Sequence, residues 1–184
     1  GRRLLKKTLR FYKKYPECMR QMADITTQIS PISLREIDHT VTNYSDKNKV
    51  SYYLKSGELF NMYNEYKNKL SGYSKKLFDP FCRRQRIFVN YETKAHTYIG
   101  DDKKIIKEYK KREDGLVTTV GQMHFFMWAI TNEIIDFCIE NEASISREMD
   151  LIAKTKKTNK KYNVVKEKDA NNDSDSDIRV IISF

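Results

Sequence analysis

The feature that most constrains the fold is an apolar stretch near residue 130. Its first part is apolar on nearly every face of a helix, which predicts a helix buried on all sides. Thr119 and Gln122 have the spacing of a capping box, so they predict where this helix begins. We therefore expect a compact helical domain around a central apolar helix near 119–140. The apolar residues of this stretch are Met123, Phe125, Phe126, Met127, Trp128, Ala129, Ile130, Ile134, Ile135, Phe137, Cys138 and Ile139.

Further helices are expected before and after the central one. Ser33 and Glu36 form a second capping box, which predicts a helix that ends near 43–48. Ser56-Gly57 predicts the start of another helix, which Pro80 would stop because proline lacks a backbone donor. Short helices are also expected around 105–109 and 144–154. The apolar stripe of the helix before Pro80 consists of Leu59, Tyr63, Tyr66, Leu70 and Tyr73.

A small amount of β-structure should accompany these helices. Residues 86–91 have the composition of a strand, and residues 95–99 could pair with them as a β-hairpin near 86–99. Residues 50–54 are also β-prone. The chain has only six glycines and three prolines, which is too few for an all-β fold full of tight turns. The expected fold class is therefore mainly α (α+β).

The first 30 residues predict a basic amphipathic helix. Residues 2–20 carry eight positive charges and one negative charge, while Leu5, Leu9 and Tyr12 recur at helical spacing. Four interpretations remain open: a phosphate-binding arm, a helix on a membrane surface, a transit peptide, or a first helix that docks its apolar stripe on the core. The basic residues at the start of this helix are Arg2, Arg3, Lys6, Lys7 and Arg10.

The character of the chain changes after about residue 155. Residues 156–177 are rich first in lysine and then in aspartate and asparagine, which predicts a disordered linker. Residues 178–184 are apolar and β-prone again. The expected organisation is thus a basic helix at 1–30, a globular domain at 31–155, this linker, and a C-terminal strand or partner-binding motif. The candidate partner-binding residues of that motif are Ile178, Val180, Ile182 and Phe184.

No pattern that supports catalysis is present. The chain has no phosphate-binding glycine loop, no zinc-protease motif and no hydrolase nucleophile motif. Its three cysteines and three histidines are scattered, which argues against a metal site and against a disulfide framework. No apolar run approaches the ~20 residues that span a bilayer. We expect a protein of a reducing, intracellular environment that is not an enzyme and takes no cofactor.

Basic and aromatic residues are interleaved between positions 66 and 86. The net charge of the whole chain is +10, and residues 61–90 hold seven positive charges against two negative ones. Lysine and arginine neutralise phosphates, and aromatic rings can stack on exposed bases. The alternative is that Tyr66, Tyr73, Phe78 and Phe81 are core residues and the charges only face water. The candidate phosphate contacts here are Lys75, Lys76, Arg83, Arg84 and Arg86.

Three segments together resemble an uncharacterised protein family of nucleocytoplasmic large DNA viruses, the giant viruses. They are Thr42–Asn48, Tyr73–Arg84 and Thr118–Ile130, and the resemblance covers roughly residues 30–152. The chain departs from the family pattern near His39 and Thr40, where the family has an aromatic residue. The resemblance carries no known activity or site. It implies a viral protein in the host cytoplasm, in a virus factory or in the virion.

Charge and resemblance together lead to two functional hypotheses. The first is a non-enzymatic viral protein that binds DNA or RNA mainly through the phosphate backbone. The second is a structural or adaptor protein of the virion or of a viral transcription assembly, which contacts viral proteins through residues 178–184.

Overall fold

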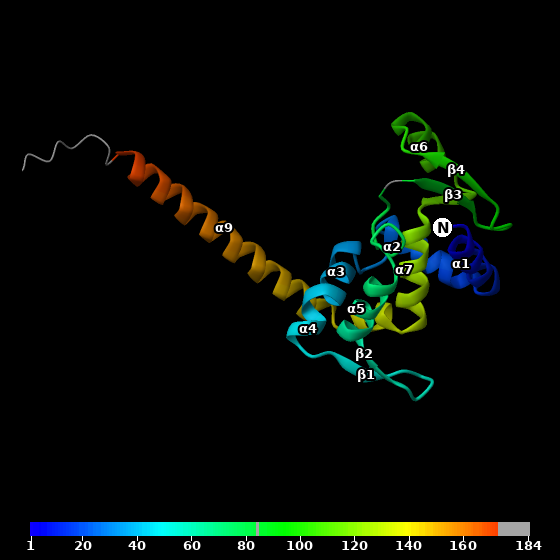
Figure 1. Ribbon diagram of the computed structural model, residues 1–184, viewed down its shortest axis with the longest axis horizontal. Helices are drawn as coiled ribbons and strands as arrows, with labels where there is room; N and C mark the ends of the chain where they lie inside the picture. Colours follow the sequence, from blue (N-terminus) through cyan, green and yellow to red (C-terminus); the bar gives the residue numbers. More distant parts are fainter. Residues whose placement is uncertain (84, 173–184) are drawn as a thin grey trace, which may run out of the picture. The chain divides into compact units, whose positions relative to one another are not determined.

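The computed structural model describes residues 1–83 and 85–172 (Figure 1). The chain divides into two compact units, Gly1–Ile145 and Ser146–Phe184. The mainly helical fold class with a small β-component is confirmed. The elements of the first unit are, in chain order, α1 (Arg2–Lys14), α2 (Pro16–Thr26), α3 (Leu34–His39), the π-helix η1 (Thr40–Tyr44), α4 (Ser45–Lys47), β1 (Ser51–Tyr53), β2 (Leu59–Asn61), α5 (Met62–Gly72), β3 (Arg86–Asn90), β4 (His96–Gly100), α6 (Lys103–Lys110), β5 (Gly115–Thr118), α7 (Val120–Thr131) and α8 (Ile134–Glu140).

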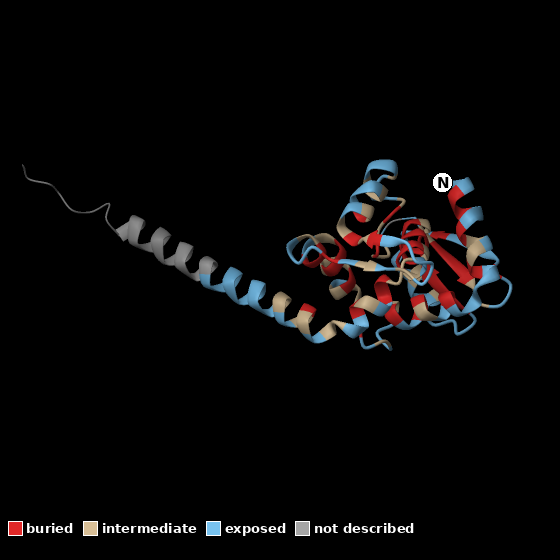
Figure 2. Ribbon diagram, turned by 90° about the horizontal axis from the view of Figure 1, so that it is seen from below, coloured by how far each residue is buried: buried red, intermediate tan, exposed pale blue. Residues whose placement is uncertain are grey.

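Helix α7 is the centre of the first unit, as the apolar stretch predicts. Phe125, Phe126 and Ala129 have no exposed surface, and Trp128 is only 4% exposed. The ring of Trp128 lies 5.2 Å from that of Phe78 and 5.7 Å from that of Phe125, centre to centre. Side chains of this kind stabilise a fold by about 1.5–3 kcal/mol each when fully buried. The buried residues, coloured red in Figure 2, accordingly gather on the inner faces of the helices and strands.

The expected central helix is in fact two helices. It is interrupted at Glu133, whose φ of 58° is left-handed and ends α7 before α8 begins. The hairpin of β1 and β2 holds this break from outside. The Tyr52 hydroxyl donates to the Asn132 carbonyl at 2.7 Å, and the Lys55 amide donates to the Glu133 carboxylate at 2.9 Å. The sequence pattern missed the break because no glycine or proline marks it.

Three strands form an antiparallel sheet in the order β4-β3-β5. The hairpin expected near 86–99 is confirmed as β3 and β4, whereas β5 was not predicted. Phe88 and Val117 are cross-strand partners on the face that α6 covers with Ile106 and Tyr109. The alternate residues Ile87 and Val89 point to the opposite face and are fully buried.

The helix expected from Ser56 to Pro80 is shorter at both ends. Ser56-Gly57 belongs to the turn between β1 and β2, where Gly57 has a φ of 84°. Helix α5 begins only after Asn61, whose side chain caps it by accepting from the Asn64 amide. It ends at Gly72, well before Pro80, so the proline does not stop it.

The two expected capping boxes form to different extents. The box at Ser33 and Glu36 is confirmed on both of its hydrogen bonds. At α7, Thr119 accepts from the Gln122 amide as expected. The Gln122 side chain does not return to Thr119, because it donates to the Pro80 carbonyl and accepts from Thr118. The second box is therefore only half formed.

The structure differs from the expected division of the chain at two places. Helices α1 and α2 pack on α7, so residues 1–30 belong to the first unit and not to a separate region. A disordered linker was expected at 156–177, but α9 extends over Glu142–Asn172. Residues 173–177 and the expected strand at 178–184 lie outside the described residues. No helix of the described part is long and apolar enough to cross a membrane.

Gly121 gives a direct test of this packing. A Cβ at this position would lie 2.6 Å from the Lys76 carbonyl oxygen, so we expect Gly121→Ala to lower the free energy of unfolding by about 1–3 kcal/mol. Helix propensity alone would raise it by up to about 1 kcal/mol. Gly72→Ala is the matched control, because its Cβ meets nothing within 4 Å and should not destabilise. Urea unfolding measures the free energy of unfolding of both variants. An equal change in this free energy would contradict the close packing of Gly121 against Lys76.

Candidate nucleic-acid interface

Helix α1 is fixed to the core by one face. Leu4, Leu5, Thr8 and Tyr12 are buried, and they recur at the spacing of one helical stripe. The Tyr12 hydroxyl donates to the Met123 carbonyl in α7 at 2.8 Å, and its side chain has no exposed surface. Of the four interpretations of this segment, the structure therefore supports the docked first helix. Docking leaves the other face of α1 open.

The open face of α1 is strongly positive. The helix contains no acidic residue, and none of its basic side chains forms an ion pair with another described residue. Several cations close together on one rigid helix create a positive potential that attracts polyanions. All five basic residues predicted here are exposed, and four of them line a shallow hollow. The five are Arg2, Arg3, Lys6, Lys7 and Arg10, and the hollow is formed by all except Arg2.

The positive face of α1 continues towards α5. His124 is buried on α7, its Nδ1 lies 2.8 Å from the Leu77 carbonyl oxygen, and its ring packs against that of Tyr73. Burial lowers the pKa of His124 most, and the charges of Lys69 and Lys7 lower this pKa further. Lys7 from α1 and Lys69 from α5 therefore both act electrostatically on the same imidazole. We call Arg2, Arg3, Lys6, Lys7, Arg10 and Lys69 the α1 face.

The basic cluster expected at 75–86 does not form one open surface. Lys75 and Lys76 are exposed. Arg83, by contrast, donates from Nε and Nη2 to the two carboxylate oxygens of Asp79, both at 2.9 Å. Arg86 is only 24% exposed and donates to Asp101 at 2.7 Å. Arg84 lies outside the described residues.

Two carboxylates lie close to Lys75 and Arg83. Burial raises the pKa of Asp38 most, and the charge of Asp79 raises it further, while the charges of Arg83 and Lys75 act in the opposite direction. The two cations thus lie close to two carboxylates. Phosphate would have to compete with these carboxylates, which weakens this region as a binding surface compared with the α1 face.

The aromatic residues of the same region are mostly core residues. Phe78 and Tyr66 are buried next to Trp128, so they cannot stack on bases. Their expected role in binding is therefore corrected to the alternative that they belong to the core. Tyr73 and Phe81 are half-buried, and Phe81 lies under the guanidinium of Arg83.

A second positive region was missed. A groove of about 710 Å³ runs beside β5, and its lining brings Arg86 together with four basic residues that were not predicted as a site. The periodicity of the expected helix at 105–109 would have placed three of them on one face, at i, i+4 and i+7. What the sequence did not reveal was β5, which the groove follows. The four additional basic residues are Lys103, Lys107, Lys110 and Arg112.

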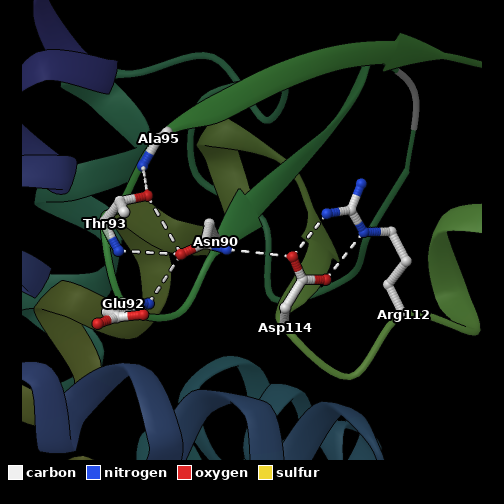
Figure 3. Close-up of polar contacts among 6 residues, drawn as sticks. All are labelled: Asn90, Glu92, Thr93, Ala95, Arg112 and Asp114. Carbon is white, nitrogen blue, oxygen red and sulfur yellow. Dashed lines mark hydrogen bonds and ion pairs between the residues drawn. The ribbon is translucent and has the colours of Figure 1, made fainter.

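Hydrogen bonds between two turns fix one end of this groove (Figure 3). Arg112 donates from Nε to Asp114 at 2.8 Å, and Asp114 accepts from the Asn90 side chain at 3.2 Å. Asn90 in turn accepts from the backbone amides of Glu92 and Thr93, so the turn after β3 is held to the turn before β5. The guanidinium of Arg112 is thereby held in one place.

Within residues 1–83 and 85–172, no group of three His, Cys, Asp or Glu side chains could hold a metal ion.

The pKa of His124 tests whether Lys7 of α1 and Lys69 of α5 act on this residue. Because this pKa is lowered from its ordinary value of 6.5, the unfolded chain binds a proton more readily, and stability should fall as the pH drops below 6.5. Lys7→Glu should raise the pKa of His124, because it replaces a nearby cation by an anion. NMR titration of the imidazole measures this. Lys13→Glu is the control, and an equal shift in both variants would contradict a specific placement of Lys7.

Comparison with known proteins places the chain in a family. A family model described as a family of unknown function, DUF7197, matches residues 1–183. An uncharacterized protein of Acanthamoeba polyphaga mimivirus is 35% identical over 161 residues, which are 86% of this chain and 56% of that protein. The chain thus spans little more than half the length of this relative. No solved structure matches the chain. The resemblance to an uncharacterised giant-virus family is confirmed, and the chain belongs to the family DUF7197, whose function is unknown.

Proposed function

We propose that this protein is a non-enzymatic viral nucleic-acid-binding protein, and that the α1 face contacts the phosphate backbone of DNA or RNA. The observation that carries the proposal is the row of exposed cations on a helix that has no acidic residue. Such a surface gains affinity by releasing counterions from the nucleic acid, which needs no particular base sequence.

The anchoring of α1 makes this surface suitable for binding. Its inward side chains and the Tyr12 hydroxyl hold the helix on α7, so the outward cations need no ordering of the backbone when a ligand binds. Lys69 extends the face, and Lys75 and Lys76 add exposed charge after α5. Arg83 and Arg86 contribute less, because each is already paired with a carboxylate. The site of action we propose is the virus factory in the host cytoplasm, or the virion.

Binding across a salt series tests the proposal. We expect the affinity for unrelated DNA and RNA oligonucleotides, measured by fluorescence anisotropy, to fall linearly with salt on logarithmic axes. The triple variant Arg3→Glu, Lys7→Glu, Arg10→Glu should bind much more weakly. For this variant, the slope of log affinity against log salt concentration should be smaller in magnitude by about two to three, because each phosphate contact contributes about 0.7–0.9 to that slope.

A matched control has the same change in net charge. Lys55→Glu, Lys104→Glu, Lys111→Glu reverses three cations that are exposed and lie outside the α1 face and the groove. This control should lose much less affinity than the α1 variant. Equal losses would show that only net charge matters, and no binding of the unchanged protein at low salt would contradict the proposed function.

A second function, that of an adaptor acting through protein contacts, is favoured by the hairpin of β1 and β2. Tyr53 and Leu59 are cross-strand partners, and they are 72% and 59% exposed. Exposed apolar residues that are contiguous on a surface can contribute to a contact with a partner protein. The C-terminal residues 178–184 lie outside the described residues and add nothing to this argument. Absence of salt-dependent nucleic-acid binding would favour the adaptor function.

A further inference from the structure

We propose that the groove beside β5 binds an extended acidic segment of a partner protein, which adds as a strand to the free edge of β5. This site is separate from the α1 face and does not depend on the proposed nucleic-acid binding. Three observations support it: an unpaired strand edge, basic walls and an apolar floor.

The strand edge follows from the register of the sheet. β5 is the outer strand in the order β4-β3-β5, so among the described residues no second strand pairs with its other edge. The amide of Tyr91 donates to the Asp114 carbonyl, and Val89 is opposite Leu116, which identifies these as the hydrogen-bonded pairs. The backbone groups of the intervening residues Gly115 and Val117 therefore point away from β3. Both residues line the groove.

The walls of the groove are positive. Lys103, Lys107 and Lys110 line it from one face of α6, and its lining includes no aspartate or glutamate. Arg86 at the start of β3 and Arg112 before β5 also line it, but they are paired with Asp101 and Asp114, so the lysines supply its open charge. The three lysines form no ion pair with another described residue. The charge complement of these walls is a segment that carries carboxylates.

The two walls meet at Cys82. Burial raises the pKa of the Cys82 thiol most, and the charges of Arg86 and Lys110 lower this pKa, so both cations lie near the same sulfur atom. The Cys82 Sγ lies 3.9 Å from the Val117 carbonyl oxygen at the strand edge. Cations from β3 and α6 thus flank the edge at which the added strand would bind.

The floor of the groove is apolar. Leu34, Ile106, Leu116 and Val117 contribute to its lining. In an added strand, successive side chains point to opposite faces of the sheet, as Leu116 and Val117 do in β5. One set can therefore lie beside Leu116, while the other set reaches Ile106 and the lysines of α6. The fitting ligand therefore alternates acidic and apolar residues.

The strand edge favours a peptide over a nucleic acid. Gly115 presents an amide donor and a carbonyl acceptor, and Val117 presents its amide, while the Val117 carbonyl also accepts a weak hydrogen bond from Cys82 Sγ. Alternating donors and acceptors are the pattern that another peptide backbone complements. A phosphate backbone carries only acceptors, so it would be repelled by the carbonyl oxygens that alternate with the amides. We therefore infer a protein ligand for this groove, although its charge alone would also suit a nucleic acid.

Labelled synthetic peptides test the proposal. The probe is a fluorescein-labelled peptide of alternating aspartate and valine, measured by anisotropy with the full chain. It should bind, whereas a peptide of alternating lysine and valine should not. N-methylation of all aspartate amides blocks one edge of the probe, and N-methylation of all valine amides blocks the other. Strand addition predicts that only one of these two isomers loses binding, because only one edge of the probe faces β5.

Variants of the protein locate the site. Lys107→Glu, Lys110→Glu should weaken binding of the probe by about tenfold or more, because two charge pairs become repulsive. Lys104→Glu, Lys111→Glu is the control, with one exposed lysine in α6 and one at its C-cap, neither of which lines the groove. It should retain most of the binding. The triple α1 variant should bind the probe as the unchanged protein does.

Several outcomes would overturn this inference. Equal binding of both N-methylated isomers would show simple charge attraction without strand addition. Equal losses in the two double variants would place the probe elsewhere. If a single-stranded oligonucleotide displaces the probe, and Lys107→Glu, Lys110→Glu removes binding of that oligonucleotide, the groove is a nucleic-acid site. Loss of nucleic-acid binding in the α1 variant alone would leave the inference intact.

Discussion

The structure of the first unit depends on the burial of α7. This helix is apolar around most of its circumference, so it can be stable only when other elements cover every side. Helices α1 and α2 cover part of it, α8 packs beside it, and the segment around Phe78 covers its beginning and Trp128. Each covering element must place its own apolar residues inward. Its polar and basic residues are therefore directed to the outside.

The two positive surfaces are consequences of this burial. On α1, the residues that pack on α7 determine which residues face outward. Every charged residue on the outward face is basic. On α6, Ile106 and Tyr109 pack on the sheet through Phe88 and Val117, which leaves the lysines of the next turns beside β5. The surfaces differ in shape and chemistry. The α1 face is an open row of cations, whereas the groove combines cations with an apolar floor and a strand edge.

The sequence predicted the structure best where residues that are close together in the chain determine it. Hydrophobic periodicity predicts the burial of α7, and the reciprocal side-chain bonds of Ser33 and Glu36 predict the start of α3. The hairpin of β3 and β4 was predicted for the same reason, because its two strands are adjacent in sequence.

Predictions failed where a contact between distant residues decides the structure. The break at Glu133 is held by Tyr52 and Lys55, and no local signal marks it. Strand β5 is only a few residues long and is recognisable by its pairing with β3. The sequence could not show that Arg83 pairs with Asp79, or that Asp38 lies near both. For the candidate site, the five exposed cations of α1 were predicted, and the groove was missed because it requires β5.

The central claim is that the α1 face binds the nucleic-acid backbone. Acetylation of the lysines with and without a bound oligonucleotide, measured by mass spectrometry, tests this claim most directly. The account predicts that the oligonucleotide protects Lys6, Lys7 and Lys69 from acetylation, while Lys104 and Lys111 react as in the free protein. Protection of Lys107 and Lys110, with Lys6 and Lys7 still fully reactive, would contradict it.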